Sequence, residues 1–295
     1  MALYTPLPPL AGIPTAASDP AWLERMYNNR AMVPDHAERL RDWARRSAVV
    51  RASQPAALDL RYGPEASETL DVFPAATADA ASVLVFLHGG YWRALDKADH
   101  SFVAPAFNQA GVCVVVPNYA LCPGTEAAPV GIGTIARQMQ AVLAWVQCHI
   151  HAHGGDPARI TVAGHSAGGQ LAAWLLAQNP AEVRNALSIS GLHDLEPIWR
   201  TAFLQQDLRL DAAQVQALSP ARLPAPARGR LVAVVGGDES AEFLRQAQLV
   251  QDVWGAQRVP RVEVLPGRNH FTVLEALAEP DHALHRLALE LLRSA

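Results

Sequence analysis

The chain has 295 residues, half of them hydrophobic and 18% charged, so it is long enough to bury a large core and is near the upper size for a single core. Its formal net charge is −4 and no basic stripe runs along it, which excludes a typical nucleic-acid-binding protein. The three cysteines are scattered and match neither a disulfide framework nor a zinc site. No signal peptide is recognisable, and no segment approaches the ~18 apolar residues of a membrane span. We therefore expect a cytoplasmic protein that does not associate with membranes.

The N-terminal part is predicted to form an irregular arm followed by broken helices. Residues 1–18 are rich in proline and alanine, and Asp19-Pro20 is typical of a helix start. The segment from Ala21 to Trp43 is helical in parts and is interrupted at Val33-Pro34. We treat residues 1–45 as one N-terminal region.

Residues 59–64 and 68–74 alternate between apolar and polar side chains, which predicts an antiparallel strand pair at a sheet edge. From there the chain alternates between buried strands and helices. We expect strands at 82–87, 112–116, 160–163, 184–190, 231–235 and 262–265, and helices at 132–146 and 282–292. This pattern predicts an α/β protein, with a mostly parallel, doubly wound, eight-stranded sheet in one domain over residues 1–295. The alternation lapses over residues 191–229, a candidate cap.

A nucleophile motif lies where a predicted strand meets a predicted helix. Gly164-x-Ser166-x-Gly168 follows a β-branched run and precedes apolar residues at helical spacing, as in the G-x-S-x-G nucleophile elbow. A serine on such a strained turn needs neighbours that are nearly free of side chain. Its hydroxyl then stands at a helix N-terminus, where amides favour developing negative charge. Ser166 is the predicted nucleophile.

A second glycine motif supplies candidate donors for an oxyanion. In His88-Gly89-Gly90-Tyr91-Trp92, the two glycines let the backbone approach a reacting centre with free amides. The amide of Ala167, next to the nucleophile, is the expected second donor. We expect His88 to anchor the loop, and Tyr91 and Trp92 to pack nearby or bind substrate.

His270 is the candidate base, since it lies in a loop after the last predicted strand, where the chain order serine, acid, histidine places the base. We expect His165, inside the elbow, to be structural and to point away from the serine. His149, His151 and His153 resemble a metal cluster, but no carboxylate or cysteine completes a ligand set, so no metal site is expected.

Three carboxylates are candidates for the acid. It should follow the strand at 231–235, where Asp238 and Glu239 are adjacent and only one can face the histidine. Aspartate is the commoner acid of a triad, whereas Gly236 lies three residues before Glu239 and gives the loop room to turn. Asp194, after the preceding strand, is a third candidate.

Together these motifs resemble the α/β-hydrolase superfamily, and His88-Gly89-Gly90-Tyr91-Trp92 is similar to the HGGxW loop of its arylformamidase group. Other segments are also similar to that group, among them Tyr27-Asn28-Asn29-Arg30, Leu70-Asp71-Val72-Phe73, Asn118-Tyr119-Ala120-Leu121-Cys122-Pro123 and Ser240-Ala241-Glu242-Phe243. The register of the last segment implies that Glu239 is the acid, although that group commonly has aspartate there.

The resemblance implies a serine hydrolase that cleaves N-formylkynurenine to kynurenine and formate, without a metal or organic cofactor. A general carboxylesterase for short-chain esters is the alternative, and a non-catalytic binding protein on the same scaffold is a third. We expect a small-molecule substrate, and the sequence leaves a homodimer open.

Overall fold

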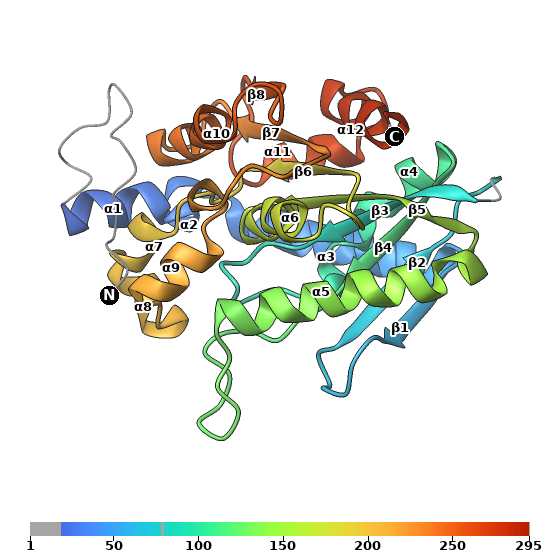
Figure 1. Cartoon of the computed structure of the whole chain (residues 1–295), viewed down its shortest axis with the longest axis horizontal. Helices are drawn as coiled ribbons and strands as arrows, with labels where there is room; N and C mark the ends of the chain where they lie inside the picture. Colours follow the sequence, from blue (N-terminus) through green and yellow to red (C-terminus); the bar gives the residue numbers. More distant parts are fainter. Residues whose placement is uncertain (1–18, 78–79, 295) are drawn as a thin grey trace.

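The computed structural model describes residues 19–77 and 80–294, and one sheet of eight strands forms its centre (Figure 1). The expected arm over residues 1–18 lies outside the described residues. The strands are β1 (Ala57–Arg61), β2 (Thr69–Phe73), β3 (Ala81–Leu87), β4 (Val112–Pro117), β5 (Gly155–His165), β6 (Asn185–Ile189), β7 (Arg230–Gly236) and β8 (Arg261–Leu265). They lie in the order β1-β2-β4-β3-β5-β6-β7-β8. The predicted edge pair is confirmed, because β1 and β2 are antiparallel to each other. β2 is also antiparallel to β4, and the six strands from β3 to β8 run parallel.

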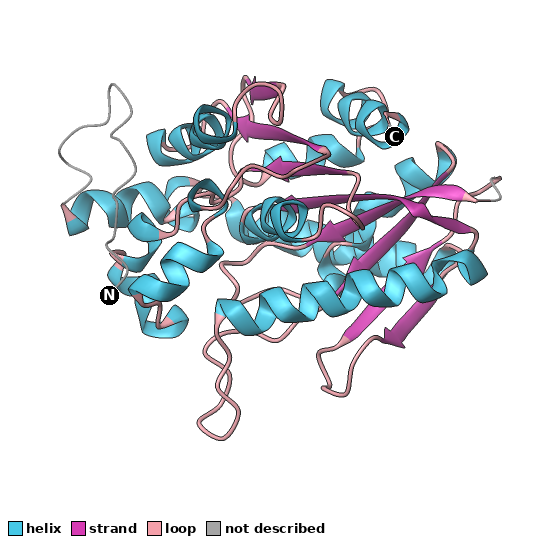
Figure 2. Cartoon of the chain, in the orientation of Figure 1, coloured by secondary structure: helices cyan, strands magenta, loops and turns pink. Residues whose placement is uncertain are grey.

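The central strands are buried on both faces, and their side chains alternate between two cores. In β3, Val83 and Val85 belong to one core, while Leu84 and Phe86 belong to the other. Helices cover each face, as Figure 2 shows in cyan. The first core includes α5 (Ile132–His149), α6 (Ala167–Gln178) and α10 (Ala241–Trp254); the second includes α3 (His36–Ser53), α4 (Ala104–Gln109), α11 (Thr272–Glu275) and α12 (Ala283–Arg293). This is the predicted α/β-hydrolase architecture.

Two further groups of helices lie beside the sheet. The N-terminal group is α1 (Pro20–Tyr27) and α2 (Asn29–Met32), and the group between β6 and β7 is α7 (Glu196–Trp199), α8 (Ala202–Leu208), α9 (Ala212–Leu218) and the 3₁₀ turn η5 (Pro220–Arg222). Other 3₁₀ turns are η2 (Lys97–Asp99), η3 (Ser101–Val103), η4 (Ile150–His153) and η6 (Ala276–Ala278). Figure 1 shows α1, α2, α7 and α8 gathered at one end of the molecule. Among the described residues, no helix combines the length and apolar character needed to cross a membrane.

The start of α1 follows from its sequence. Asp19 accepts a hydrogen bond from the amide of Ala21 at 3.0 Å, and Pro20 occupies the first helical position. This arrangement satisfies one of the amides that a helix start leaves without a partner.

The helices break at Val33-Pro34 as predicted, but α3 continues ten residues beyond Trp43 to Ser53. The end of α3 is rich in arginine and alanine, so it lacks the apolar period that would have predicted it.

Candidate active site

The elbow holds Ser166 in a backbone conformation that ordinary residues avoid. Ser166 has φ 57° and ψ −117° between the end of β5 and the start of α6. A Cβ atom at Gly164 would overlap the Gly168 carbonyl group, and a Cβ atom at Gly168 would overlap the carbonyl of Leu87. The turn therefore closes only with glycine on both sides of the serine, and the strain at Ser166 is typical of a functional position.

The carboxylate that meets His270 belongs to Glu239. His270 Nδ1 lies 2.6 Å from Glu239 Oε2, and both side chains are almost fully buried, with exposed fractions of 7% and 1%. Glu239 Oε1 accepts hydrogen bonds from Ser190 Oγ at 2.6 Å and from the Gly236 amide at 2.7 Å. The Glu239 carboxylate is thus held by three donors: His270 Nδ1, Ser190 Oγ and the Gly236 amide. In turn it orients the His270 imidazole so that the Nδ1–H points toward Glu239.

The other two acids lie elsewhere. Asp238 is exposed, and only its amide takes part in the loop, donating to the carbonyl of Arg268. Asp194 accepts a hydrogen bond from Arg222 Nε at 2.9 Å. Gly236, where a Cβ atom would overlap the Arg268 carbonyl and lie 3.1 Å from Glu239 Oε1, allows the tight turn that directs Glu239 inward.

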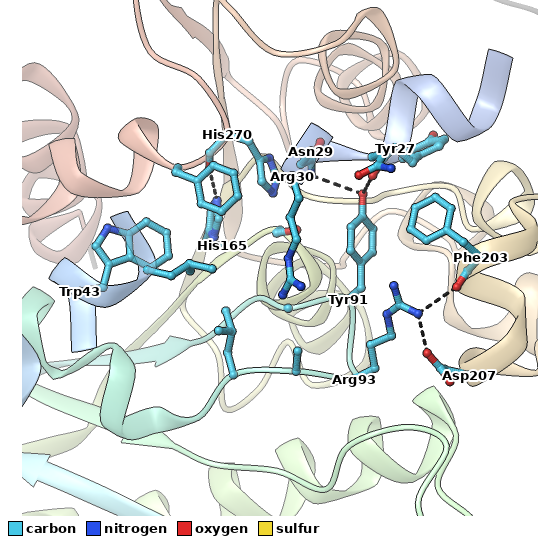
Figure 3. Close-up of a pocket in the computed structure, with 17 residues that line it drawn as sticks. Tyr27, Asn29, Arg30, Trp43, Tyr91, Arg93, His165, Phe203, Asp207 and His270 are labelled. Carbon is cyan, nitrogen blue, oxygen red and sulfur yellow. Dashed lines mark hydrogen bonds and ion pairs between the residues drawn. The ribbon is translucent and has the colours of Figure 1, made fainter. Parts of the chain in front are cut away.

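Ser166 and His270 both line a cavity of about 380 Å³. Figure 3 shows its labelled walls. Four parts of the chain complete it: residues 27–30, Leu40 and Trp43 of α3, the loop after β3, and Phe203 with Asp207 of α8. Within residues 19–77 and 80–294 no hydrogen bond joins the Ser166 hydroxyl to His270, and such bonds commonly form only when substrate is bound.

The glycine loop runs beside the serine. A Cβ atom at Gly89 would lie 3.2 Å from Ser166 Cβ, and Gly90, with φ 105°, lines the cavity. His88 Nδ1 donates to the Gly89 carbonyl at 2.8 Å, and the Tyr119 hydroxyl donates to the carbonyls of His88 and Gly89 at 2.9 and 3.2 Å. Because these contacts fix the carbonyl groups of His88 and Gly89, they also fix the orientation of the loop backbone beside Ser166.

Tyr91 and Trp92 have different surroundings: of the two expected roles, Trp92 takes the packing role and is not part of the substrate-binding wall. Tyr91 lines the cavity, and its hydroxyl donates to the Tyr27 carbonyl at 2.7 Å and accepts from Asn29 Nδ2 at 3.3 Å. Trp92 is fully buried outside the cavity lining, and its indole N–H donates to Gln170 Oε1 at 3.2 Å. Burial of the large indole in the core removes it from the substrate side.

His165 and His88 are buried in the neutral form. His165 donates from Nε2 to the carbonyl of His270 at 2.8 Å, and burial, with the nearby His270, holds the pKa of His165 well below its ordinary value. Its ring nevertheless lines the cavity, so His165 supports the loop that carries the base. Burial lowers the pKa of His88 to about 3, and His88 stacks on Tyr119 with ring centroids 4.0 Å apart.

His149, His151 and His153 lie at the end of α5 and in the 3₁₀ turn η4. In the part of the chain that the structure describes, no group of three histidine, cysteine, aspartate or glutamate side chains is placed to hold a metal ion. His149 and His153 instead pack around the ring of Trp145.

The lapse of the alternation over residues 191–229 predicts a cap, and Phe203 and Asp207 of this segment line the cavity. Sequence reasoning did not identify the walls that Asn29 and Arg30 contribute. These two residues lie far from the motifs along the chain, and the available signal is the resemblance of Tyr27-Asn28-Asn29-Arg30 to the arylformamidase group.

Comparisons with known proteins agree with this geometry. The sequence model of the carboxylesterase family matches residues 62–215. A kynurenine formamidase from Salmo salar is 27% identical over 285 residues, or 92% of each chain, and one from Danio rerio is 25% identical over 80% of this chain and 81% of its own. A crystal structure of a provisionally named thioesterase from Silicibacter sp. superposes with a TM-score of 0.78 at 31% identity, covering 89% of this chain and 97% of its own.

A parallel sheet with a strained serine at its elbow and a buried carboxylate–histidine pair defines a serine hydrolase of the α/β-hydrolase fold. More particularly, the chain belongs to the carboxylesterase family.

Proposed function

We propose that this enzyme is an arylformamidase that hydrolyses N-formylkynurenine to kynurenine and formate. The observation that carries the proposal is the single cavity shared by Ser166, His270 and a set of aromatic walls, in a chain similar along 92% of its length to a kynurenine formamidase. The three free cysteines are usual for a reducing compartment, so a cytoplasmic location belongs to the same proposal.

The proposed chemistry is acyl transfer through the serine. Ser166 Oγ attacks the formyl carbon while His270 Nε2 takes its proton, and Glu239 holds the opposite side of the imidazole. The amides of Ala167 and of Gly89 or Gly90 stabilise the oxyanion. His270 then protonates the departing aryl amine as the C–N bond breaks, and a water molecule, activated by the same histidine, releases formate from Ser166.

The size and lining of the cavity support a compact aromatic substrate. About 380 Å³ is near the lower end of small-molecule sites. Trp43, Tyr91, Phe203 and Phe271 provide aromatic walls that suit one substrate ring. A formyl group adds only two heavy atoms to the substituent of such a ring, so the substrate as a whole stays compact.

The proposal is tested by incubating the purified protein with N-formylkynurenine and measuring the formation of kynurenine by absorbance. Ser166→Ala should reduce kcat by a factor on the order of 10³ or more, because the nucleophile is lost. Ser53→Ala, at an exposed serine at the end of α3, is the matched control and should retain full activity. Absence of turnover in the native enzyme, or turnover that survives Ser166→Ala, would contradict the proposal.

A further inference from the structure

The cavity contains one charge that the described protein does not compensate. Arg93 and Asp207 both line it, but they form an ion pair at 2.5 Å, and Arg93 also donates to the Phe203 carbonyl at 2.8 Å. Burial raises the pKa of Tyr27 and of Tyr91, so both hydroxyls stay neutral. Burial holds the neighbouring His165 neutral as well, by lowering its pKa.

Arg30 is the remaining cation. It lines the cavity from α2, and within the described ranges it has neither an ion pair nor a hydrogen bond through its guanidinium. Figure 3 shows its side chain extended from α2 across the cavity, with the guanidinium among the lining residues rather than turned away. A guanidinium left without a protein partner in a binding cavity is suited to an anionic group of the ligand.

The position of Arg30 relative to the serine is set by hydrogen bonds of its neighbours. The Tyr91 hydroxyl donates to the carbonyl of Tyr27 and accepts from Asn29, so it contacts the chain on the N-terminal side of Arg30. Tyr91 itself follows Gly90 in the loop beside Ser166. These contacts join α2 to the catalytic loop, and therefore attach the backbone at Arg30, whose side chain is exposed, to the loop beside Ser166.

We infer that Arg30 binds a carboxylate of the substrate and makes the enzyme selective for aryl formamides that carry a carboxylate over those that lack one. The inference rests on the proposed function and specifies its substrate class. In N-formylkynurenine the formamide and the side chain that ends in the carboxylate are on adjacent ring carbons, and the side chain places the carboxylate several bonds away from the ring. With the formyl carbon at Ser166 and the ring between the aromatic walls, the carboxylate extends toward Arg30. Guanidinium and carboxylate groups pair through two parallel hydrogen bonds, which fixes orientation as well as affinity.

The test compares two substrates that differ only in this group: N-formylkynurenine and N-formylkynuramine, which lacks the carboxylate. The native enzyme should favour the carboxylated substrate in kcat/KM by about tenfold or more, the size typical of a charged hydrogen-bonded pair. Arg30→Gln should abolish that preference, mainly through a higher KM for N-formylkynurenine, and Arg30→Lys should restore part of it. Arg25→Gln, at an exposed arginine of α1 outside the cavity lining, should keep the native preference.

Equal losses on both substrates in Arg30→Gln would overturn the inference, because they would show that Arg30 supports the fold of the site rather than binding the carboxylate. If the native enzyme hydrolyses neither formamide, the proposed function fails, and Arg30 is tested separately. Aryl acetates with and without a carboxylate on the aryl group then replace the formamides, and loss of the preference for the charged ester in Arg30→Gln supports the role of Arg30. An unchanged preference, or none in the native enzyme, overturns it.

Discussion

At the scale of single residues, the carboxylate beside His270 shows how local geometry selects between neighbouring acids. Glu239 has one more methylene group than aspartate, and the turn at Gly236 places its Oε1 within 2.7 Å of the Gly236 amide. Ser190 supplies a second donor at 2.6 Å. Because Oε1 is held in this way, Oε2 is left for His270, and the exposed Asp238 has no such support.

Glu239→Gln should lower kcat by about 10³-fold or more, because the neutral amide neither stabilises the imidazolium nor fixes its tautomer as the carboxylate does. Asp238→Asn removes a charge from the adjacent position and should change kcat by less than about twofold. The measurement is kcat on the same substrate, with thermal unfolding of both variants to verify their fold. A severe loss in Asp238→Asn alone would refute the assignment of the acid.

At the scale of elements, the N-terminal helices form one wall of the site although they precede every strand. The Tyr27 hydroxyl donates to Glu242 Oε2 at 2.6 Å and accepts from Gln246 Nε2 at 3.1 Å, which attaches α1 to α10. Glu242 also pairs with Arg245 at 2.7 Å. A buried network of this kind fixes α1 in place, and with it the residues that α1 and α2 contribute to the cavity.

Tyr27→Phe removes one donor from this network and should lower the free energy of unfolding by about 1–2 kcal/mol. It should also raise KM several-fold with little change in kcat, because the wall moves while the serine and histidine do not. Tyr62→Phe is the control: it removes a comparable hydrogen bond, from its hydroxyl to the Asn118 carbonyl at 2.7 Å, outside the cavity lining. If both variants change KM equally, the wall is not held by Tyr27.

The strands and the elbow could be predicted because their signals are local. Buried parallel strands appear as short apolar runs, and the turn at Ser166 requires glycine two residues before and after it. The walls of the cavity could be predicted only in part: the lapse of the alternation over residues 191–229 predicts a cap that includes Phe203, but nothing in the sequence shows that Tyr27 lines the same cavity. The motif leaves packing and substrate binding open for Trp92, and only the fold shows that its ring enters the core.

At the scale of the whole molecule, buried histidines couple folding to pH. Burial lowers the pKa of His88 to about 3 and of His193 to about 4, and burial also lowers the pKa values of His100 and His165. Each is neutral in the folded protein, whereas in the unfolded chain each takes up a proton near pH 6.5. Below that pH the unfolded state binds more protons than the folded state, so stability falls as pH falls.

Urea unfolding should therefore show full stability above about pH 7 and a decline between about pH 6.5 and 4, at up to about 1.4 kcal/mol per pH unit for each histidine that remains neutral. The carboxylate of Asp59, whose pKa is lowered chiefly by the hydrogen bond from Lys97, adds its loss only below its ordinary range near pH 4. Constant stability between pH 7.5 and 5 would show that these histidines are not held neutral.

We propose that the cavity above Ser166 accepts a formamide in preference to a simple ester. The most direct test measures kcat/KM for N-formylkynurenine, p-nitrophenyl acetate and p-nitrophenyl butyrate on the same purified enzyme. We expect a strong preference for the formamide over both esters, because the aromatic walls beside Ser166 suit the ring of the aryl formamide. Efficient turnover of both esters with little or none of the formamide would contradict it, and would identify a general carboxylesterase on the same catalytic residues.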